Sequence, residues 1–246
     1  NRTPPGAPQK TGSPTIPNHG LFSYMLPYLE LAPLWDGLSL DVDPSSDTLG
    51  RYTDVPTYVC PSWPDPSVFR SQPQAWLNGA ITTYQGSNGA HTVGNRRLVK
   101  SQFGDLPNNG MVRFGEGSSI RDAADAAAVK FREVADGLSK TVFVMEFVQR
   151  DSGSAPPGNV RAWVLSNNGQ KALYSAKTVG LPPNQTVMRD IAGIDFNELP
   201  FGSRHQGGML AVFGDGSVRW VDDFIAANVY KALSTIDSQE AVAGLP

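Results

Sequence analysis

Two short apolar runs around a polar turn form the clearest pattern of hydrophobic and polar positions in this chain. Residues 209–213 (MLAVF) and 218–221 (VRWV) flank the polar run 214–217 (GDGS). An Asp-Gly pair between apolar runs is a strong hairpin signal, because the glycine, here Gly216, supplies the positive φ that the turn needs. We therefore predict a hairpin whose second strand buries one face while Arg219 points elsewhere.

A second apolar run predicts the central strand of a sheet. Residues 141–148 (TVFVMEFV) are apolar at both odd and even positions, a pattern typical of a strand covered on both faces. Glu146 interrupts the run, so its carboxylate must be paired or lie at the end of the strand. Shorter strands are predicted at residues 57–60, 80–85, 111–114 and 160–165, with a turn at residues 86–89 after the second of these.

Helical patterns are short. Residues 121–136 predict one helix or two helical pieces, because residues 123–128 have high helix propensity and Asp136-Gly137 ends the run. Near the end of the chain, Asp222 or Asp223 can cap a helix that ends near Thr235 and carries Ile225, Val229 and Leu233 on one face.

Composition favours a loop-rich α+β protein. The 246 residues include 25 Gly and 20 Pro, with few long Ala- or Leu-rich runs, which indicates an antiparallel sheet with short helices and excludes a helical bundle. Residues 1–19 are rich in Pro and predict an extended N-terminal arm that buries little surface. Residues 20–246 then form a single globular domain.

Charge and cysteine content exclude several classes of protein. A net charge of -3 without a basic stripe argues against a nucleic-acid partner. No apolar run is long enough to cross a membrane. The chain begins at Asn1, and we expect that a segment upstream of it has been removed. The single Cys60 excludes an intrachain disulfide and cannot by itself form a cysteine zinc site.

A partial calcium motif lies in an acidic loop. Asp41, Asp43, Ser45 and Asp47 offer oxygen ligands at alternate positions, as the start of a calcium loop does. The motif is incomplete, since Ser46 stands where glycine is needed and Tyr52 stands where a bidentate glutamate is needed. A solvated turn at Pro44 is the alternative, so no metal or other cofactor is assigned and Ca²⁺ stays open.

The common catalytic motifs are absent from the sequence. There is no nucleophile elbow, no His-Glu-x-x-His, no phosphate-binding Gly-rich loop and no dinucleotide fingerprint. His205 and Asp215 lie at opposite ends of a predicted strand and cannot share a catalytic role unless the chain bends back. We therefore interpret His205 as bonded to a loop carbonyl beside Gly207 and Gly208, Asp215 as a turn residue, and Cys60 as a small buried hydrophobe.

Five ordered segments resemble a planctomycete-type family of prepilin-like proteins of unknown function. The segments are LPYLE (26–30), CPS (60–62), DGLSKT (136–141) followed by a strand and Glu146, the His-x9-Asp-Gly signature, and ALST (232–235) followed by Glu240. The signature includes His205, Gly207, Gly208, Asp215 and Gly216, with nine residues between the histidine and the aspartate.

The resemblance implies the head of a membrane-anchored structural protein. Members of that family carry a prepilin-type cleavage and methylation signal and a long hydrophobic helix, as type IV pilins and type II secretion pseudopilins do, and then a globular head. The implied protein is non-catalytic, lies in the cell envelope or at the cell surface, and has other pilin-like or secretion-system subunits as partners. Its contact with the membrane is through the N-terminal helix alone.

Two other functions stay open from the sequence. A carbohydrate or small-ligand binding module would use the loops around Trp63, Trp76 and His91, because aromatic rings and a histidine suit such ligands. A hydrolase that uses His205 is the least favoured alternative.

Overall fold

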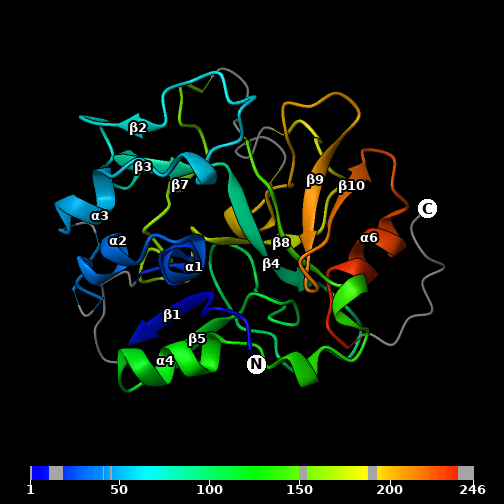
Figure 1. Cartoon of the computed structure of the whole chain (residues 1–246). Coiled ribbons are helices and arrows are strands. Elements are labelled where there is room, and N and C mark those ends of the chain that lie inside the picture. Colours follow the sequence, from blue (N-terminus) through cyan, green and yellow to red (C-terminus); the bar gives the residue numbers. More distant parts are fainter. Residues whose placement is uncertain are drawn as a thin grey trace.

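The computed structural model describes residues 2–10, 19–40, 42–44, 46–149, 154–187 and 193–237. Its strands form three sheets, of five, three and two strands (Figure 1). The five-stranded sheet occupies the middle of the molecule, the three-stranded sheet lies beside it, and the two-stranded sheet lies with α4 at the end where the N-terminus is marked. Helices and sheets mix in this way in α+β folds, which confirms the predicted fold class.

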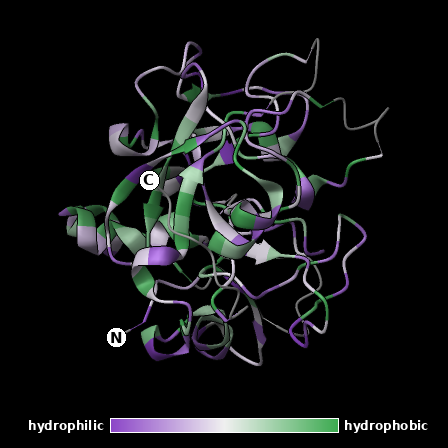
Figure 2. Cartoon of the chain, turned by 90° about the vertical axis from the view of Figure 1, so that its right-hand side faces the viewer, coloured by the Kyte–Doolittle hydropathy of each residue, from purple (hydrophilic) through white to green (hydrophobic). Residues whose placement is uncertain are grey.

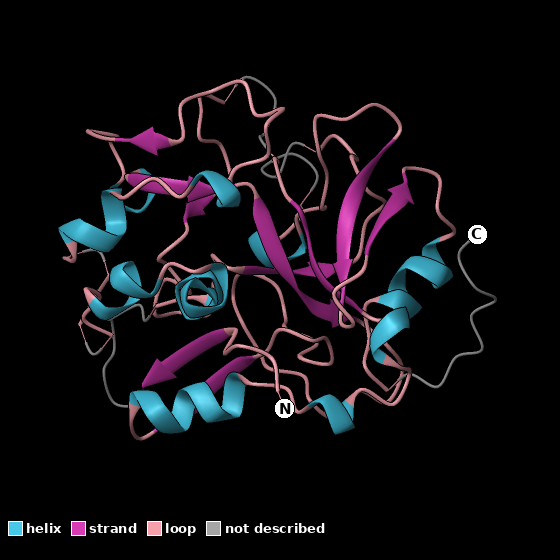
Figure 3. Ribbon diagram, in the orientation of Figure 1, coloured by secondary structure: helices cyan, strands magenta, loops and turns pink. Residues whose placement is uncertain are grey.

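The regular elements are short, as Figure 3 shows. The α-helices are α1 (Leu21–Met25), α2 (Ala32–Asp36), α3 (Thr48–Tyr52), α4 (Ile120–Ala127) and α6 (Ala227–Leu233). The strands are β1 (Ala7–Lys10), β2 (Val68–Phe69), β3 (Gly79–Thr82), β4 (Tyr84–Ala90), β5 (Phe114–Gly117), β6 (Val142–Glu146), β7 (Arg161–Ala162), β8 (Ala176–Val179), β9 (Gly208–Phe213) and β10 (Val218–Asp222). Within the described ranges, none of the helices has the length and apolar character needed to span a bilayer.

The five-stranded sheet has the order β10-β9-β6-β4-β8. β6 is its central strand, as the apolar run predicted, and pairs antiparallel with β9 on one side and with β4 on the other. Glu146 ends β6, so the prediction that this carboxylate is paired or terminal is confirmed. β8 pairs parallel with β4, which makes the sheet mixed, and this strand has no clear periodicity in the sequence.

The predicted hairpin is present as β9 and β10. Val218 pairs with Val212, and the turn residue Gly216 has a φ of 84°. The buried face of β10 carries Val221, whereas Val218 and Trp220 are exposed. Arg219 lies on the same side as Val221 and stacks over the Phe213 ring, 4.5 Å from its centroid, so the expectation that it points away from the buried face is wrong.

The turn predicted at residues 86–89 is wrong, because these residues continue β4 through the centre of the sheet. A Cβ on Gly86 would lie 2.5 Å from Val112, and one on Gly89 would lie 2.6 Å from the backbone nitrogen of Gly110. Asn88 donates to the Val112 carbonyl at 3.0 Å. Glycine is therefore needed here so that the loop before β5 can lie against the strand.

Several smaller elements differ from their predicted bounds. Residues 56–58 form a 3-10 turn instead of a strand, and the strand predicted at 111–114 begins only at Phe114. The strand predicted at 160–165 is reduced to β7. The predicted helix at 121–136 forms two pieces, α4 and a 3-10 turn at 131–133. The last helix begins after Ala226, later than the predicted aspartate cap, since Asp222 instead accepts from the Phe224 amide in a turn.

The N-terminal segment is extended, as predicted, but residues 2–10 are docked on the domain. β1 pairs parallel with β5, and the Thr3 amide donates to the Val129 carbonyl at 2.8 Å. Ala7 and His19 are fully buried, so the expectation that the arm buries little surface is wrong for residues 2–10 and for His19. Asn1 and residues 11–18 of the predicted arm lie outside the described residues.

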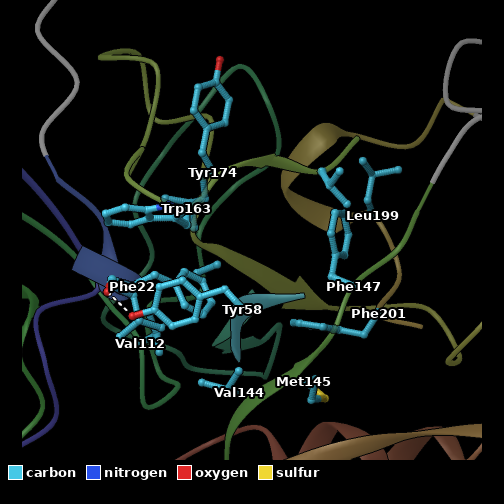
Figure 4. Packing of buried hydrophobic residues seen from close by; sticks show 14 of the residues in the cluster. Phe22, Tyr58, Val112, Val144, Met145, Phe147, Trp163, Tyr174, Leu199 and Phe201 are labelled. Carbon is cyan, nitrogen blue, oxygen red and sulfur yellow. Dashed lines mark hydrogen bonds between the residues drawn. The ribbon is translucent and has the colours of Figure 1, made fainter. Parts of the chain in front are cut away.

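The core lies between the central sheet and the loops and helices packed against it. Apolar residues follow the strands (Figure 2), and Figure 4 shows Phe22, Tyr58 and Trp163 packed together, with Phe147 against Phe201. The Tyr58 hydroxyl donates to the Phe22 carbonyl at 2.6 Å. Burial of this phenol raises its pKa well above the usual value.

Candidate functional site

Cys60, Glu146 and His205 bring three different donor atoms together at one end of β6. The Nε2 atom of His205 lies 3.5 Å from Cys60 Sγ and 3.3 Å from Glu146 Oε1, and all three donor atoms lie within 4.8 Å of one another. Across the described ranges, no other group of three or more His, Cys, Asp or Glu side chains converges in this way. We call these three residues the Cys-Glu-His cluster.

Glu146 is fixed by the strands on both sides of it. In the sheet it stands beside Tyr84 of β4, and its Oε2 atom accepts a hydrogen bond from the Leu210 amide of β9 at 2.7 Å. The Glu146 side chain is 1% exposed. Its other oxygen, Oε1, is buried and makes no hydrogen bond, although His205 Nε2 lies close to it.

Cys60 enters the cluster from the loop after the 3-10 turn at residues 56–58. Its amide donates to Thr83 Oγ1 at 2.7 Å, and its Sγ lies 3.0 Å from Ser62 Oγ. Burial raises the pKa of the thiol, and Glu146 nearby raises it further, while Ser62 opposes the shift. The same surroundings raise the pKa of Tyr84 to about 12, mainly through burial and then through the charges of Cys60 and Glu146.

His205 lies at the entry to the hairpin. Its amide donates to Ser203 Oγ at 2.9 Å, and its ring lies 6.4 Å from the ring of Trp220. The ring meets Cys60 and Glu146 instead of the loop carbonyl that the sequence predicted. With a side chain 36% exposed, His205 forms the solvent-facing side of the cluster.

The geometry disfavours a thiol nucleophile. In a Cys-His relay, one imidazole nitrogen faces the thiol and the other faces the carboxylate that orients the ring. Here a single nitrogen, Nε2 of His205, faces both Sγ and the carboxylate. A reactive cysteine also needs a lowered pKa, whereas the pKa of Cys60 is raised. Sulfur, nitrogen and oxygen donors that face one point are instead the arrangement of a metal site.

The remaining signature residues shape the hairpin. Asp215 lies at its tip, where Oδ1 accepts from the Ser217 amide at 2.9 Å and from the Ser217 hydroxyl. These bonds, with smaller help from Arg219, lower the pKa of the Asp215 carboxyl. The prediction that Asp215 is a turn residue separated from His205 is therefore confirmed. Gly207 has a φ of 87°, and its carbonyl accepts from the Asp223 amide at 3.1 Å, which fits the predicted tight entry.

Two of the four calcium candidates can be placed. Asp47 caps α3, since its Oδ1 accepts from the Gly50 amide at 3.0 Å. The Asp43 carbonyl accepts from the Ser46 amide in a turn. Asp41 and Ser45 lie outside the described residues, so calcium in this loop stays a prediction.

The residues predicted for a small-ligand site lie in different surroundings. Trp63 is buried and donates from its indole to the Pro66 carbonyl at 3.2 Å, whereas Trp76 is exposed. His91 is half exposed and faces Glu198, with 3.0 Å between Nε2 and Oε1. Of the three, His91 lines a surface hollow of about 650 Å³, together with Arg96, Arg97 and Lys231.

The sequence alone does not predict the Cys-Glu-His cluster. Cys60 and His205 are 145 residues apart, so no ligand spacing joins them. The available signal was the resemblance, because Cys60 lies in the CPS segment, Glu146 follows the DGLSKT segment, and His205 opens the His-x9-Asp-Gly signature. All three side chains are metal donors, and each was interpreted separately.

Comparison with known families gives one match over almost the whole chain. A family described as a protein of unknown function (DUF1559) matches residues 1–228, a range that includes all three residues of the cluster. Neither curated proteins nor solved structures give a match.

Proposed function

The chain belongs to the DUF1559 family of proteins of unknown function, and from this premise we propose that it is the non-catalytic head of a pilin-like or pseudopilin-like subunit at the cell surface. An anchoring helix would precede it, and neighbouring subunits of a filament or secretion assembly would be its partners. The proposal rests on the five ordered segments of the sequence and on one structural observation, the docked N-terminal segment.

An anchor positions a head only if the connection between them is ordered. Residues 2–10 run along the domain, with the Thr3 hydroxyl donating to the Met111 carbonyl at 3.3 Å and the Ala7 amide donating to the Arg113 carbonyl at 2.9 Å. The parallel pairing of β1 with β5 continues this attachment. A helix upstream of Asn1 would therefore join the domain close to a docked strand.

The absence of catalysis is part of the proposal, and the chemistry of the cluster supports it. Its thiol is kept protonated by burial and by the neighbouring carboxylate, so it is a poor nucleophile at neutral pH. The Nε2 atom of His205 faces both Cys60 and Glu146. Among the described residues, no second histidine lies in the cluster to support a hydrolase mechanism.

The test is the mature protein isolated from its native cells. We expect mass spectrometry to find a methylated N-terminal residue followed by a hydrophobic segment that leads into this domain. We also expect the protein to stay with the membrane fraction after a high-salt wash and to be released by detergent. A mature protein without that hydrophobic segment, released by salt alone, would contradict the proposal.

The hollow beside His91 favours a second candidate, a binding module for a small anionic ligand or an acidic sugar. Arg96, Arg97 and Lys231 border it, and its volume of about 650 Å³ suits a small ligand. The family label SBP_bac_10 also hints at binding. Thermal-shift screening with neutral sugars, acidic sugars and inorganic phosphate should give a shift for an acidic ligand that is lost in Arg96→Ala/Lys231→Ala. No shift with any of them would exclude this candidate.

A further inference from the structure

We propose that Cys60 Sγ, Glu146 Oε1 and His205 Nε2 bind one divalent transition-metal ion of the zinc type, and that this ion fastens the closing hairpin to the central sheet. The proposal does not depend on the assignment as a pilin-like head. It rests on the distances between the donor atoms, on the state of Glu146 and on the chemical types of the donors.

Two of the three separations between the donor atoms match the edges of a zinc tetrahedron. Zinc bonds of about 2.0 to 2.1 Å to nitrogen and oxygen and about 2.3 Å to sulfur separate tetrahedral ligands by about 3.3 to 3.6 Å. The observed separations are 3.3 Å from nitrogen to oxygen and 3.5 Å from nitrogen to sulfur. The third separation, from Cys60 Sγ to the Glu146 carboxylate, is within 4.8 Å, so adjustment of the side chains can bring all three donor atoms onto one ion.

Glu146 provides an independent observation. Its side chain is 1% exposed, and its Oε1 atom faces the cluster without a hydrogen bond. An ionised oxygen in such a place is costly unless a cation or a donor satisfies it. A divalent ion satisfies it and also balances the two negative charges of the carboxylate and the Cys60 thiolate, which leaves a neutral buried complex.

Donor chemistry selects the class of metal. A thiolate and an imidazole favour zinc and its transition-metal neighbours over magnesium or calcium, which prefer oxygen ligands. Contacts around the cluster hold the ligands in place, as bonds around known zinc ligands do: the Leu210 amide bonds Glu146 Oε2, and Ser62 Oγ lies beside Cys60 Sγ. Three protein ligands leave the fourth position of the tetrahedron to a solvent molecule, which can approach on the side of the 36% exposed His205.

The position of the cluster gives the ion a structural task. Cys60 comes from the loop between the 3-10 turn at residues 56–58 and β2, Glu146 from the central strand, and His205 from the segment that leads into β9. In the described part of the chain, the contact between Cys60 Sγ and His205 Nε2 joins the cysteine loop to the hairpin entry at this point. A metal ion would replace that weak contact by two coordinate bonds.

The test is a metal titration of the full chain after treatment with a chelator. We expect one Zn²⁺ bound per chain, and a rise of about 5 to 10 °C in melting temperature when free Zn²⁺ is about a hundredfold above its Kd. Affinity should increase with pH, because binding displaces the thiol proton. Co²⁺ in place of Zn²⁺ should give the thiolate-to-cobalt charge-transfer absorption of a tetrahedral site.

Four variants separate this site from adventitious binding. Cys60→Ser, Glu146→Gln and His205→Asn should each weaken Zn²⁺ binding by about a hundredfold or more, since removal of a ligand costs at least as much as removal of its supporting contacts. His91→Asn, which removes a histidine outside the cluster and leaves the three ligands and their supporting contacts in place, should bind one Zn²⁺ with the affinity of the wild type.

The cobalt spectrum of the wild type keeps the proposal testable even if a variant fails to fold. A wild-type protein that shows no Zn²⁺ stoichiometry, or a Co²⁺ complex without thiolate absorption, would overturn the proposal. Equal zinc affinity in folded Cys60→Ser and wild type would also overturn it, because the ion would then bind elsewhere.

Discussion

At the scale of single residues, His19 is a titratable side chain that the fold keeps away from water. It is fully buried, its Nδ1 lies 3.2 Å from Ser23 Oγ, and its Nε2 has no hydrogen-bond partner. Burial lowers the pKa of His19, and this effect outweighs the opposing charges of Asp47 and Asp43. The folded protein therefore holds the neutral imidazole.

His19 should make the protein sensitive to mild acid. Below about pH 6.5 this histidine is protonated more readily in the unfolded chain than in the folded chain. The free energy of unfolding therefore decreases as the pH falls. We expect the loss of unfolding free energy between pH 7 and pH 5, measured by urea denaturation, to be smaller in His19→Gln. NMR titration of the wild-type ring should give a pKa below 6.5. An identical loss in the variant would show that His19 does not cause it.

The residues of the candidate site show why sequence alone falls short at this scale. Asp215 could be predicted as a turn residue, because its partner, Ser217, is two positions away. Glu146 could be predicted as paired, because an ionised side chain in an apolar strand needs a partner. The identity of that partner depends on how β6, β9 and the Cys60 loop come together, which is decided by tertiary packing.

At the scale of elements, the closing hairpin depends on the conformation of Gly216. Its φ of 84° is costly for a residue with a Cβ, and the space around its α-carbon is open, so backbone strain is the only penalty. We expect Gly216→Val to lower the free energy of unfolding by about 1 to 3 kcal/mol, measured by urea denaturation.

Gly180 offers a matched control for the hairpin. It also has open space around it, but its φ is not in the left-handed region. Gly180→Val should therefore change stability by less than about 0.5 kcal/mol. Equal losses in the two variants would mean that the volume of the valine, and not the φ of the turn, is responsible.

Elements were predictable where their signal is local. The hairpin and β6 follow from an Asp-Gly turn and a continuous apolar run. The second half of β4 could not be predicted, because its sequence, Gly86-Ser-Asn-Gly, has the composition of a turn. In the structure these residues allow the loop at Val112 to lie close against the strand. β8 has four residues, one of which is the fully buried Lys177, whose Nζ donates to the Leu173 carbonyl at 2.6 Å. Neither strand can be predicted without the partner that covers it.

At the scale of the whole molecule, residues 2–10 complete the domain. β1 covers β5, and α4 packs against both strands. The fully buried Ala7 is continuous with the main hydrophobic core. A Pro-rich composition predicts an extended chain but gives no information on whether that chain lies free or docked. The docked strand is therefore a property of the assembled molecule.

Substitutions at Ala7 and Arg2 distinguish the contribution of the docked strand to stability from that of a surface ion pair. Ala7→Asp places an unpaired carboxylate in the core, so we expect a loss of about 2 kcal/mol or more in unfolding free energy. Arg2→Ala removes only the exposed ion pair with Asp125 and should cost less than about 1 kcal/mol. Urea denaturation gives both values, and hydrogen exchange should show faster exchange of β5 amides in Ala7→Asp alone. Unchanged stability and β5 protection in Ala7→Asp would mean that the N-terminal strand is dispensable, and the proposed ordered connection to an anchor would lose its support.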